Sequence, residues 1–203
     1  MQVTGMAKDS REKLMGAATQ LFAEKGFSGV SIRELAAAAG VNSSLISYHF
    51  GGKEGLYEAV VASQYERVIG RFEKIATAPG TARDKIRMYA EVIRLNHTVD
   101  QPFMARLIQG ELSMPTACLE NVIRKYTARM AQVVTGIIQE GMDKGEFRTD
   151  IPPIFAAVSL AGMCNFYFVL REITKAVLPE SEKQDSAFIE AALQIYLKGM
   201  GRN

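Results

Sequence analysis

Residues 43–53 contain the side-chain types that a DNA-reading helix needs. Small hydroxyl groups near the N-terminus of such a helix approach base edges, and larger hydrogen-bond donors at its flanks hold phosphates. Lys53 follows a Gly-Gly pair and opens the next helix, whose N-terminal dipole adds to the attraction for a phosphate. The polar residues assigned to this outer face and its flank are Ser43, Ser44, Ser47, Tyr48, His49 and Lys53.

Two helix-start signals and a glycine turn would position these side chains. Ser31 and Glu34 form an S-x-x-E capping box that starts a helix, and Gly40 tolerates the positive φ that ends one. Asn42 can cap a second helix, in which Ile46 points back toward the first. This pattern predicts a helix-turn-helix. For the pattern alone, a capped helical hairpin with a solvated polar face is the alternative.

Three runs of residues carry a family resemblance: A-A-x-x-L-F-A-E-K-G-F from Ala17, V-S-I-R-E-L-A-A-A-A-G-V from Val30, and Y-H-F-G-G-K-E-G-L from Tyr48. On these runs, residues 10–60 resemble the N-terminal DNA-binding domain of TetR-family transcriptional regulators. The resemblance implies an obligate homodimer, a small-molecule pocket in the C-terminal domain and repression relieved by a ligand. Carried over by position, the residues that meet DNA are Arg33, Ser44, Leu45, Ser47, Tyr48, His49 and Lys53.

The chain departs from the family pattern at two of these positions. Family members often have Tyr where Ser47 stands and a polar residue at Leu45, so the base preference does not transfer. Leu45 offers an apolar contact to a thymine methyl group instead.

Bulk properties exclude some classes of function. The chain has 203 residues, 48% of them hydrophobic, and a net charge of +2, which argues against a purely electrostatic nucleic-acid binder. Residues 1–8 lack the apolar core of a signal peptide, and Cys118 and Cys164 are far apart in apolar contexts, which predicts a cytoplasmic protein with buried cysteines. No catalytic motif, metal-ligand cluster or cofactor-binding loop occurs, so the chain is expected to be neither an enzyme nor a metal sensor.

Helical periodicity continues through the chain and predicts an all-α fold. We expect an N-terminal three-helix helix-turn-helix DNA-binding domain over residues 1–56 and a C-terminal helical ligand-binding and dimerisation domain over residues 57–203. A long helix from Lys53 to about Ala76 would link the two as a rigid lever. The other expected helices begin at Asp9, cover 81–98 and 102–111, run from Pro115 to about 143, cover 151–170, and follow Pro179.

The uncharged run at residues 151–170 is long enough for a transmembrane helix. Ser159 and Asn165 interrupt it, and no basic flank anchors it, so a helix buried between its own core and a partner is favoured. This helix and the last one are predicted to form a four-helix dimer interface, as the family resemblance also implies. The residues assigned to it are Phe155, Leu160, Phe188, Ala192, Ile195 and Tyr196.

By family position, the ligand pocket lies among the helices at 81–98, 102–113, 115–143 and 152–177. The alternative for its lining residues is plain core packing, because Met and aromatic stripes at helical spacing mostly pack together. The lining suits an apolar or aromatic ligand, and Arg106, Glu111 and Asn165 are candidates to orient its polar groups. The assigned lining residues are Phe103, Leu107, Tyr126, Met130, Met163, Phe166 and Tyr167.

These features together predict a homodimeric repressor that a small-molecule ligand releases from a palindromic operator. Two alternatives stay open: an activator on the same fold, and a helical small-molecule-binding or enzyme domain in which the DNA-binding motif is vestigial.

Overall fold

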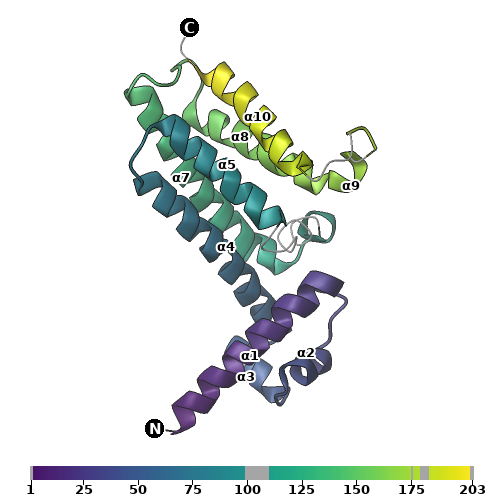
Figure 1. The fold of residues 1–203 in the computed structure, drawn as a ribbon. Coiled ribbons are helices and arrows are strands. Elements are labelled where there is room, and N and C mark those ends of the chain that lie inside the picture. The colour runs from purple at the N-terminus through teal and green to yellow at the C-terminus, as the bar shows by residue number, and fades with distance from the viewer. Residues whose placement is uncertain (1, 99–109, 175, 179–182, 202–203) are drawn as a thin grey trace. The chain divides into compact units, whose positions relative to one another are not determined.

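The computed structural model describes residues 2–98, 110–174, 176–178 and 183–201. Regular structure within these residues is helical, apart from one isolated antiparallel bridge between Phe147 and Gly201 (Figure 1). The predicted all-α fold class is therefore confirmed. The elements are α1 (Gln2–Lys25), α2 (Ile32–Ala39), α3 (Ser44–Phe50), α4 (Lys53–Thr77), α5 (Ala82–Thr98), the π-helical turn η1 (Leu119–Ile123), α7 (Arg124–Asp143), α8 (Pro153–Val169), α9 (Arg171–Thr174) and α10 (Gln184–Met200).

The chain divides into two compact units. The first contains the described residues of 1–66 and 106–126, and the second contains those of 67–105 and 127–203. Both α4 and α7 begin in the first unit and end in the second. The boundary between functional domains after residue 56 stays a prediction.

In the first unit, α1 packs across α2 and α3. Leu14, Ala18 and Phe22 form a buried i, i+4, i+8 stripe along α1. Leu35 of α2 and Ile46 of α3 are fully buried against it. The polar side of α3 is therefore left to face outward.

α1 is longer than predicted, because it begins at Gln2 and not at Asp9. The Asp9 carboxylate does not cap the helix but pairs with Lys13 one turn later, at 2.6 Å. An acidic residue suits both a first turn and an i, i+4 ion pair, so its position alone does not fix the helix start.

Residues 110–126 complete the first unit. The Glu111 side chain is buried and accepts two hydrogen bonds from Thr116, from its backbone N–H at 2.9 Å and its hydroxyl at 2.8 Å. The next helical segment begins at Ala117, two residues after the predicted start at Pro115, and passes through the π-helical turn η1 before α7. Asn121 on this turn donates to the Glu58 carboxylate of α4 at 2.8 Å.

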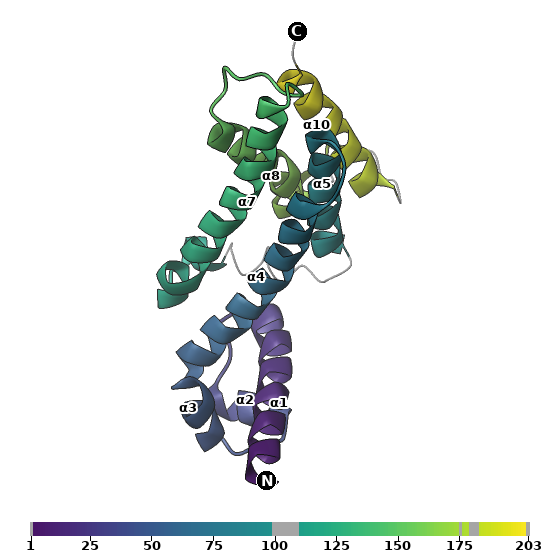
Figure 2. The ribbon, with the colours of Figure 1, turned by 90° about the vertical axis from the view of Figure 1, so that its left-hand side faces the viewer.

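The second unit is a helical bundle built from the C-terminal part of α4 with α5, α7, α8 and α10. α5 packs against both α8 and α10, and these three helices lie together in Figure 2. The Tyr196 hydroxyl of α10 donates to the Ala156 carbonyl of α8 at 3.0 Å, which joins the two helices inside the core. The largest fully buried side chains of the unit are Ile69, Phe72, Ile86, Ile138, Phe147 and Leu160.

The end of α7 fits tightly over the start of α5. A Cβ atom at Gly141 would lie 2.7 Å from Ala82 Cβ and closer still to the Phe147 ring, so this contact needs a glycine. Beside it, buried Lys85 donates to the Glu140 carboxylate at 2.7 Å and to the Ala76 carbonyl at 2.9 Å. A paired and hydrogen-bonded ammonium is the form in which a buried lysine is tolerated.

The uncharged run predicted at 151–170 is α8. Among the described residues, no helix is both long enough and apolar enough to cross a membrane. One side of α8 is buried in the unit, at Ala156, Leu160 and Cys164, while Phe155 on the other side is 65% exposed in the single chain.

Candidate DNA-binding surface

The hairpin of α2 and α3 is built by the predicted local signals. The Ser31 hydroxyl accepts from the Glu34 backbone N–H at 3.2 Å, and the Glu34 carboxylate accepts from the Ser31 N–H at 3.3 Å, which confirms the capping box. The Glu34 carboxylate also pairs with Lys25 of α1, and this hydrogen bond is the main cause that lowers the pKa of Glu34. Gly40 ends α2 with φ +64°.

The start of α3 depends on Asn42. Its side-chain oxygen accepts from the Ser44 backbone N–H at 2.9 Å and from the Ser44 hydroxyl at 2.8 Å. This is the predicted cap bond, although the regular helix begins two residues later, at Ser44. The Ser44 hydroxyl donates its hydrogen bond to Asn42, so toward a further partner it can only accept one.

The outer face of α3 has the polar character that the sequence predicts. Ser43, Ser44, Ser47 and Tyr48 are exposed, and Tyr48 keeps 76% of its surface open. Among the described residues, no hydrogen bond engages the Ser47 hydroxyl, so it can both donate and accept. Leu45 is half-buried between this face and the core.

Two predicted flank residues are engaged within the protein. His49 Nε2 lies 2.9 Å from the hydroxyl of Ser10, a buried residue of α1, so His49 ties α3 to α1. The Lys53 ammonium lies 4.2 Å from the centroid of the Phe27 ring, in a cation–π contact. Arg33, the remaining predicted residue, is exposed on α2.

Arg11 is a residue that sequence reasoning missed. It is exposed on α1, and its guanidinium lies 5.3 Å from the centroid of the Phe50 ring at the end of α3. This contact holds a permanent positive charge beside the candidate surface. No sequence signal pairs these positions, because they are 39 residues apart, like Ser10 and His49.

The predicted ligand residues are only partly brought together. Met130 and Met163 are half-buried against the core of the second unit, and Tyr167 is part of that core. Phe166 is 64% exposed on the other side of α8. Tyr126 belongs to the first unit, where its hydroxyl donates to Glu66 at 2.8 Å. Phe103, Leu107 and the polar candidate Arg106 lie outside the described residues.

The polar candidates Glu111 and Asn165 have partners within the chain. Glu111 is bonded to Thr116 in the first unit, as described above. The Asn165 side-chain oxygen lies 3.2 Å from His97 Nε2, and the imidazole stacks on Phe168 with centroids 4.5 Å apart. Burial lowers the pKa of His97, so the imidazole is neutral near pH 7.

The predicted dimer residues fall into two sets. Phe155 and Ile195 are 65% and 67% exposed, so they are open to a partner. Phe188 stacks on Tyr167 with ring centroids 4.1 Å apart, inside its own chain. Leu160, Ala192 and Tyr196 are buried in the core of the single chain, where they support the helices from behind.

The described residues hold no group of three or more His, Cys, Asp or Glu side chains placed to bind a metal ion. Cys118 and Cys164 are both free and buried, in line with the packing role expected for them. Burial, followed by the nearby Glu111 carboxylate, raises the pKa of the Cys118 thiol to about 12. Burial also raises the pKa of Cys164 to about 12. Neither thiol is a reactive thiolate near pH 7.

Comparison with known families gives two matches. Residues 14–60 match the family described as "Bacterial regulatory proteins, tetR family". Residues 86–200, more than half of the chain, match the family described as "HTH-type transcriptional dual regulator CecR, C-terminal domain", where HTH denotes helix-turn-helix. The two matches fall on the helix-turn-helix and on the helical remainder.

Individual proteins are similar over most of their length. The "Probable HTH-type transcriptional regulator YttP" of Bacillus subtilis is 29% identical over 147 residues, covering 71% of this chain and 70% of that protein. The repressor NicS of Pseudomonas putida is 26% identical over 162 residues, which cover 79% of this chain and 76% of NicS. Among solved structures, FadR of Bacillus subtilis in complex with stearoyl-CoA has a TM-score of 0.77 at 19% identity, covering 93% of this chain and 98% of that chain.

Proposed function

Because the chain belongs to the TetR family of bacterial regulatory proteins, we propose that it is a transcriptional repressor that leaves a palindromic operator when it binds a small-molecule effector. Members of this family bind operator DNA and small-molecule effectors, work as dimers and are regulators, not enzymes. Several relatives, NicS among them, are named repressors. A regulator of this class acts on chromosomal DNA, so we also propose a cytoplasmic location.

The observation that carries the proposal is the outward face of α3. It presents small hydroxyls on a helix whose start is held by the Asn42 cap bond, next to α2 with its Ser31 capping box, and the Arg33 and Arg11 cations belong to the same unit. One such helix reads only a few bases, whereas two related by a two-fold axis read a palindrome with half-sites about 34–36 Å apart. We propose that Ser44, Leu45 and Ser47 set the base preference. The residues proposed to contact the DNA sugar-phosphate backbone are Arg33, Ser43, Tyr48, His49 and Lys53.

The test is selection of sites from a random DNA pool by the purified full-length chain at a fixed salt concentration. We expect a two-fold palindrome to be enriched. Ser47→Ala should alter the preferred base at one position in each half-site, whereas Ser28→Ala, at an exposed serine outside α3, should not. Arg33→Ala should weaken binding across all sites and reduce the salt dependence by about one phosphate contact. A pool without an enriched palindrome would refute the operator proposal.

For the dimer we propose the exposed side of α8 together with α10. Phe155 and Val158 of α8 are 65% and 60% exposed, and Ile195 of α10 is 67% exposed. An apolar surface of this kind marks a protein–protein contact. Leu160, Phe188, Ala192 and Tyr196 then support the contact from inside the chain.

For the effector we propose an apolar or aromatic compound bound in the second unit. The support is the Met-rich and aromatic packing around Met130, Met163 and Tyr167, and the stearoyl-CoA held by the FadR structure. Release of the selected operator should follow addition of acyl thioesters or aromatic acids, and not of sugars of similar size. Release by the sugars alone would contradict the apolar assignment.

An activator on the same fold is the second candidate. It is favoured by the match of residues 86–200 to a domain described as that of a dual regulator. A transcriptional reporter driven by the selected operator separates the two. Removal of the protein should raise transcription if it represses and lower transcription if it activates.

A further inference from the structure

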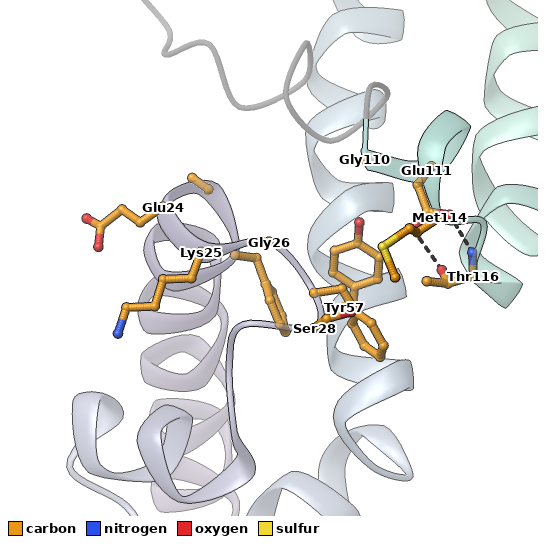
Figure 3. Close-up of a pocket in the computed structure, with 12 residues that line it drawn as sticks. Glu24, Lys25, Gly26, Ser28, Tyr57, Gly110, Glu111, Met114 and Thr116 are labelled. Carbon is orange, nitrogen blue, oxygen red and sulfur yellow. Dashed lines mark hydrogen bonds between the residues drawn. The ribbon is translucent and has the colours of Figure 1, made fainter.

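A cavity of about 330 Å³ lies within the first unit, apart from the C-terminal region where the effector is proposed. Its walls come from the end of α1 and the turn after it, from Tyr57 of α4, and from residues 110–116 (Figure 3). The volume lies within the usual range for small-molecule sites.

The cavity has an aromatic side. The rings of Phe22, Phe27 and Tyr57 line it, and their centroids are 4.9 to 6.3 Å apart. Aromatic faces carry negative charge density that attracts ammonium groups. The Lys53 ammonium already lies 4.2 Å from the Phe27 centroid, so this cluster holds one such group in the folded protein.

The cavity wall beside Tyr57 carries a buried carboxylate. Glu111 is only 2% exposed, and both of its oxygens accept from Thr116. Within the described part of the chain, no lysine or arginine forms an ion pair with it. In Figure 3 the Tyr57 side chain extends toward Glu111 and Met114. Burial and then the Glu111 charge raise the pKa of Tyr57 above its ordinary value, so its phenol stays neutral.

The charged side chains of Glu24 and Lys25 lie at the rim of the cavity, and the Lys53 ammonium on Phe27 is a further cation near it. Glu24 and Lys25 point away from Tyr57 and Glu111 in Figure 3, and Lys25 forms an ion pair with Glu34. The last turn of α1 also ends at this cavity, and the C-terminal end of a helix carries partial negative charge.

From the aromatic cluster and the buried Glu111 carboxylate, we propose that this cavity is a second ligand site, which takes a small organic ammonium cation. The apolar body of the cation lies against the three rings and Met114, and its positive charge faces Glu111. A bound cation contacts α1, α4 and residues 110–116 together, so it joins three parts of the first unit.

The test uses isothermal titration of the full-length protein with choline chloride and, separately, with 3,3-dimethylbutan-1-ol, which has the same shape without the charge. Potassium chloride at the same concentration controls for ionic strength. We expect choline to bind one site per chain and the neutral alcohol to bind at least about tenfold more weakly. Absence of choline binding, or equal affinity for the two compounds, would overturn the proposal.

Two variants locate the site. Glu111→Gln should weaken choline binding by about tenfold or more, because it removes the facing charge and keeps the shape. Glu24→Gln is the matched control, because this carboxylate at the rim points away from Tyr57 and Glu111, and it should leave the affinity within about twofold. Met114→Lys places a cation at the wall and should abolish binding. Met114 is 70% exposed, so this variant tests the site without disturbing the core. Unchanged binding in both the Glu111 and the Met114 variants would place choline elsewhere and refute the assignment.

Discussion

The substitution Phe155→Glu on α8 tests the proposed dimer most sharply. Phe155 is 65% exposed in the single chain, and it lies opposite the buried side of the same helix. The change therefore acts on the outer surface and leaves the core of the second unit intact. Phe188→Glu would be a poorer test, because Phe188 stacks on Tyr167 within its own chain and its loss would also damage the fold.

The size of the effect follows from the exposed area. A phenylalanine side chain contributes ~200 Å², so about 130 Å² of Phe155 is open to burial by a partner. At ~25 cal/mol per Å² this burial stabilises a dimer by about 3 kcal/mol per chain. A two-fold interface contains two copies, which gives about 6 kcal/mol, or about four orders of magnitude in the dissociation constant.

Sedimentation velocity over a range of protein concentrations measures this constant. We expect wild-type protein to sediment as a dimer and Phe155→Glu protein as a monomer at the same micromolar concentration. Leu112→Glu is the control, because Leu112 is 72% exposed and belongs to the first unit. A Phe155→Glu protein that remains dimeric, with an unchanged circular dichroism spectrum, would refute the assignment of α8 to the interface.

Three further predictions concern stability, measured by chemical denaturation. Ser31→Ala removes the cap of α2 and should lower the free energy of unfolding by about 1 kcal/mol, whereas Ser31→Thr should retain most of it. Gly141→Ala introduces a Cβ into a filled space and should lower the free energy of unfolding by about 2 kcal/mol or more. A smaller loss would mean that the Phe147 ring moves aside. Glu140 pairs with Lys144 and with a buried lysine of α5, which lower its pKa from 4.5 to about 2. A carboxylate with a lowered pKa stabilises the fold above its unfolded pKa. The stability difference between wild type and Glu140→Gln should therefore be full near pH 6 and disappear between about pH 4.5 and pH 2. A difference that does not change over this range would contradict the ion-pair role.

The features that the sequence predicted well are those set by neighbouring residues. The Ser31 capping box, the positive φ of Gly40 and the Asn42 cap bond each depend on a few adjacent positions, and all three are present. Helix α4 ends within a residue of its predicted end for the same reason, since a Pro-Gly pair follows it. The residues assigned to base reading on α3 come from the family resemblance and, for the two serines, also from the polar outer face, and their role stays a prediction.

What the sequence did not predict depends on residues that are far apart in the chain. The bond between Ser10 and His49 braces α3 against α1, and only the packing of these two helices reveals it. The π-helical turn η1 was not expected, because its extra residue per turn leaves the apolar spacing almost unchanged. An apolar stripe alone does not tell whether it packs within its own chain or against a partner. For this reason the sequence pattern also assigns the inward side of α10 to the dimer interface.

Helices α4 and α7 each continue from the first unit into the second, and contacts near this point join them within the first unit. α4 starts beside α3 and continues past Glu66 into the second unit, and α7 continues past Tyr126 in the same way. Near these crossings the Tyr126 hydroxyl donates to Glu66, and its ring stacks on Tyr65 with centroids 5.5 Å apart. An effector alters DNA affinity only by the difference between its binding energies for two states of the protein. A state in which α4 and α7 separate at this point must give up both contacts, so these contacts oppose such a separation.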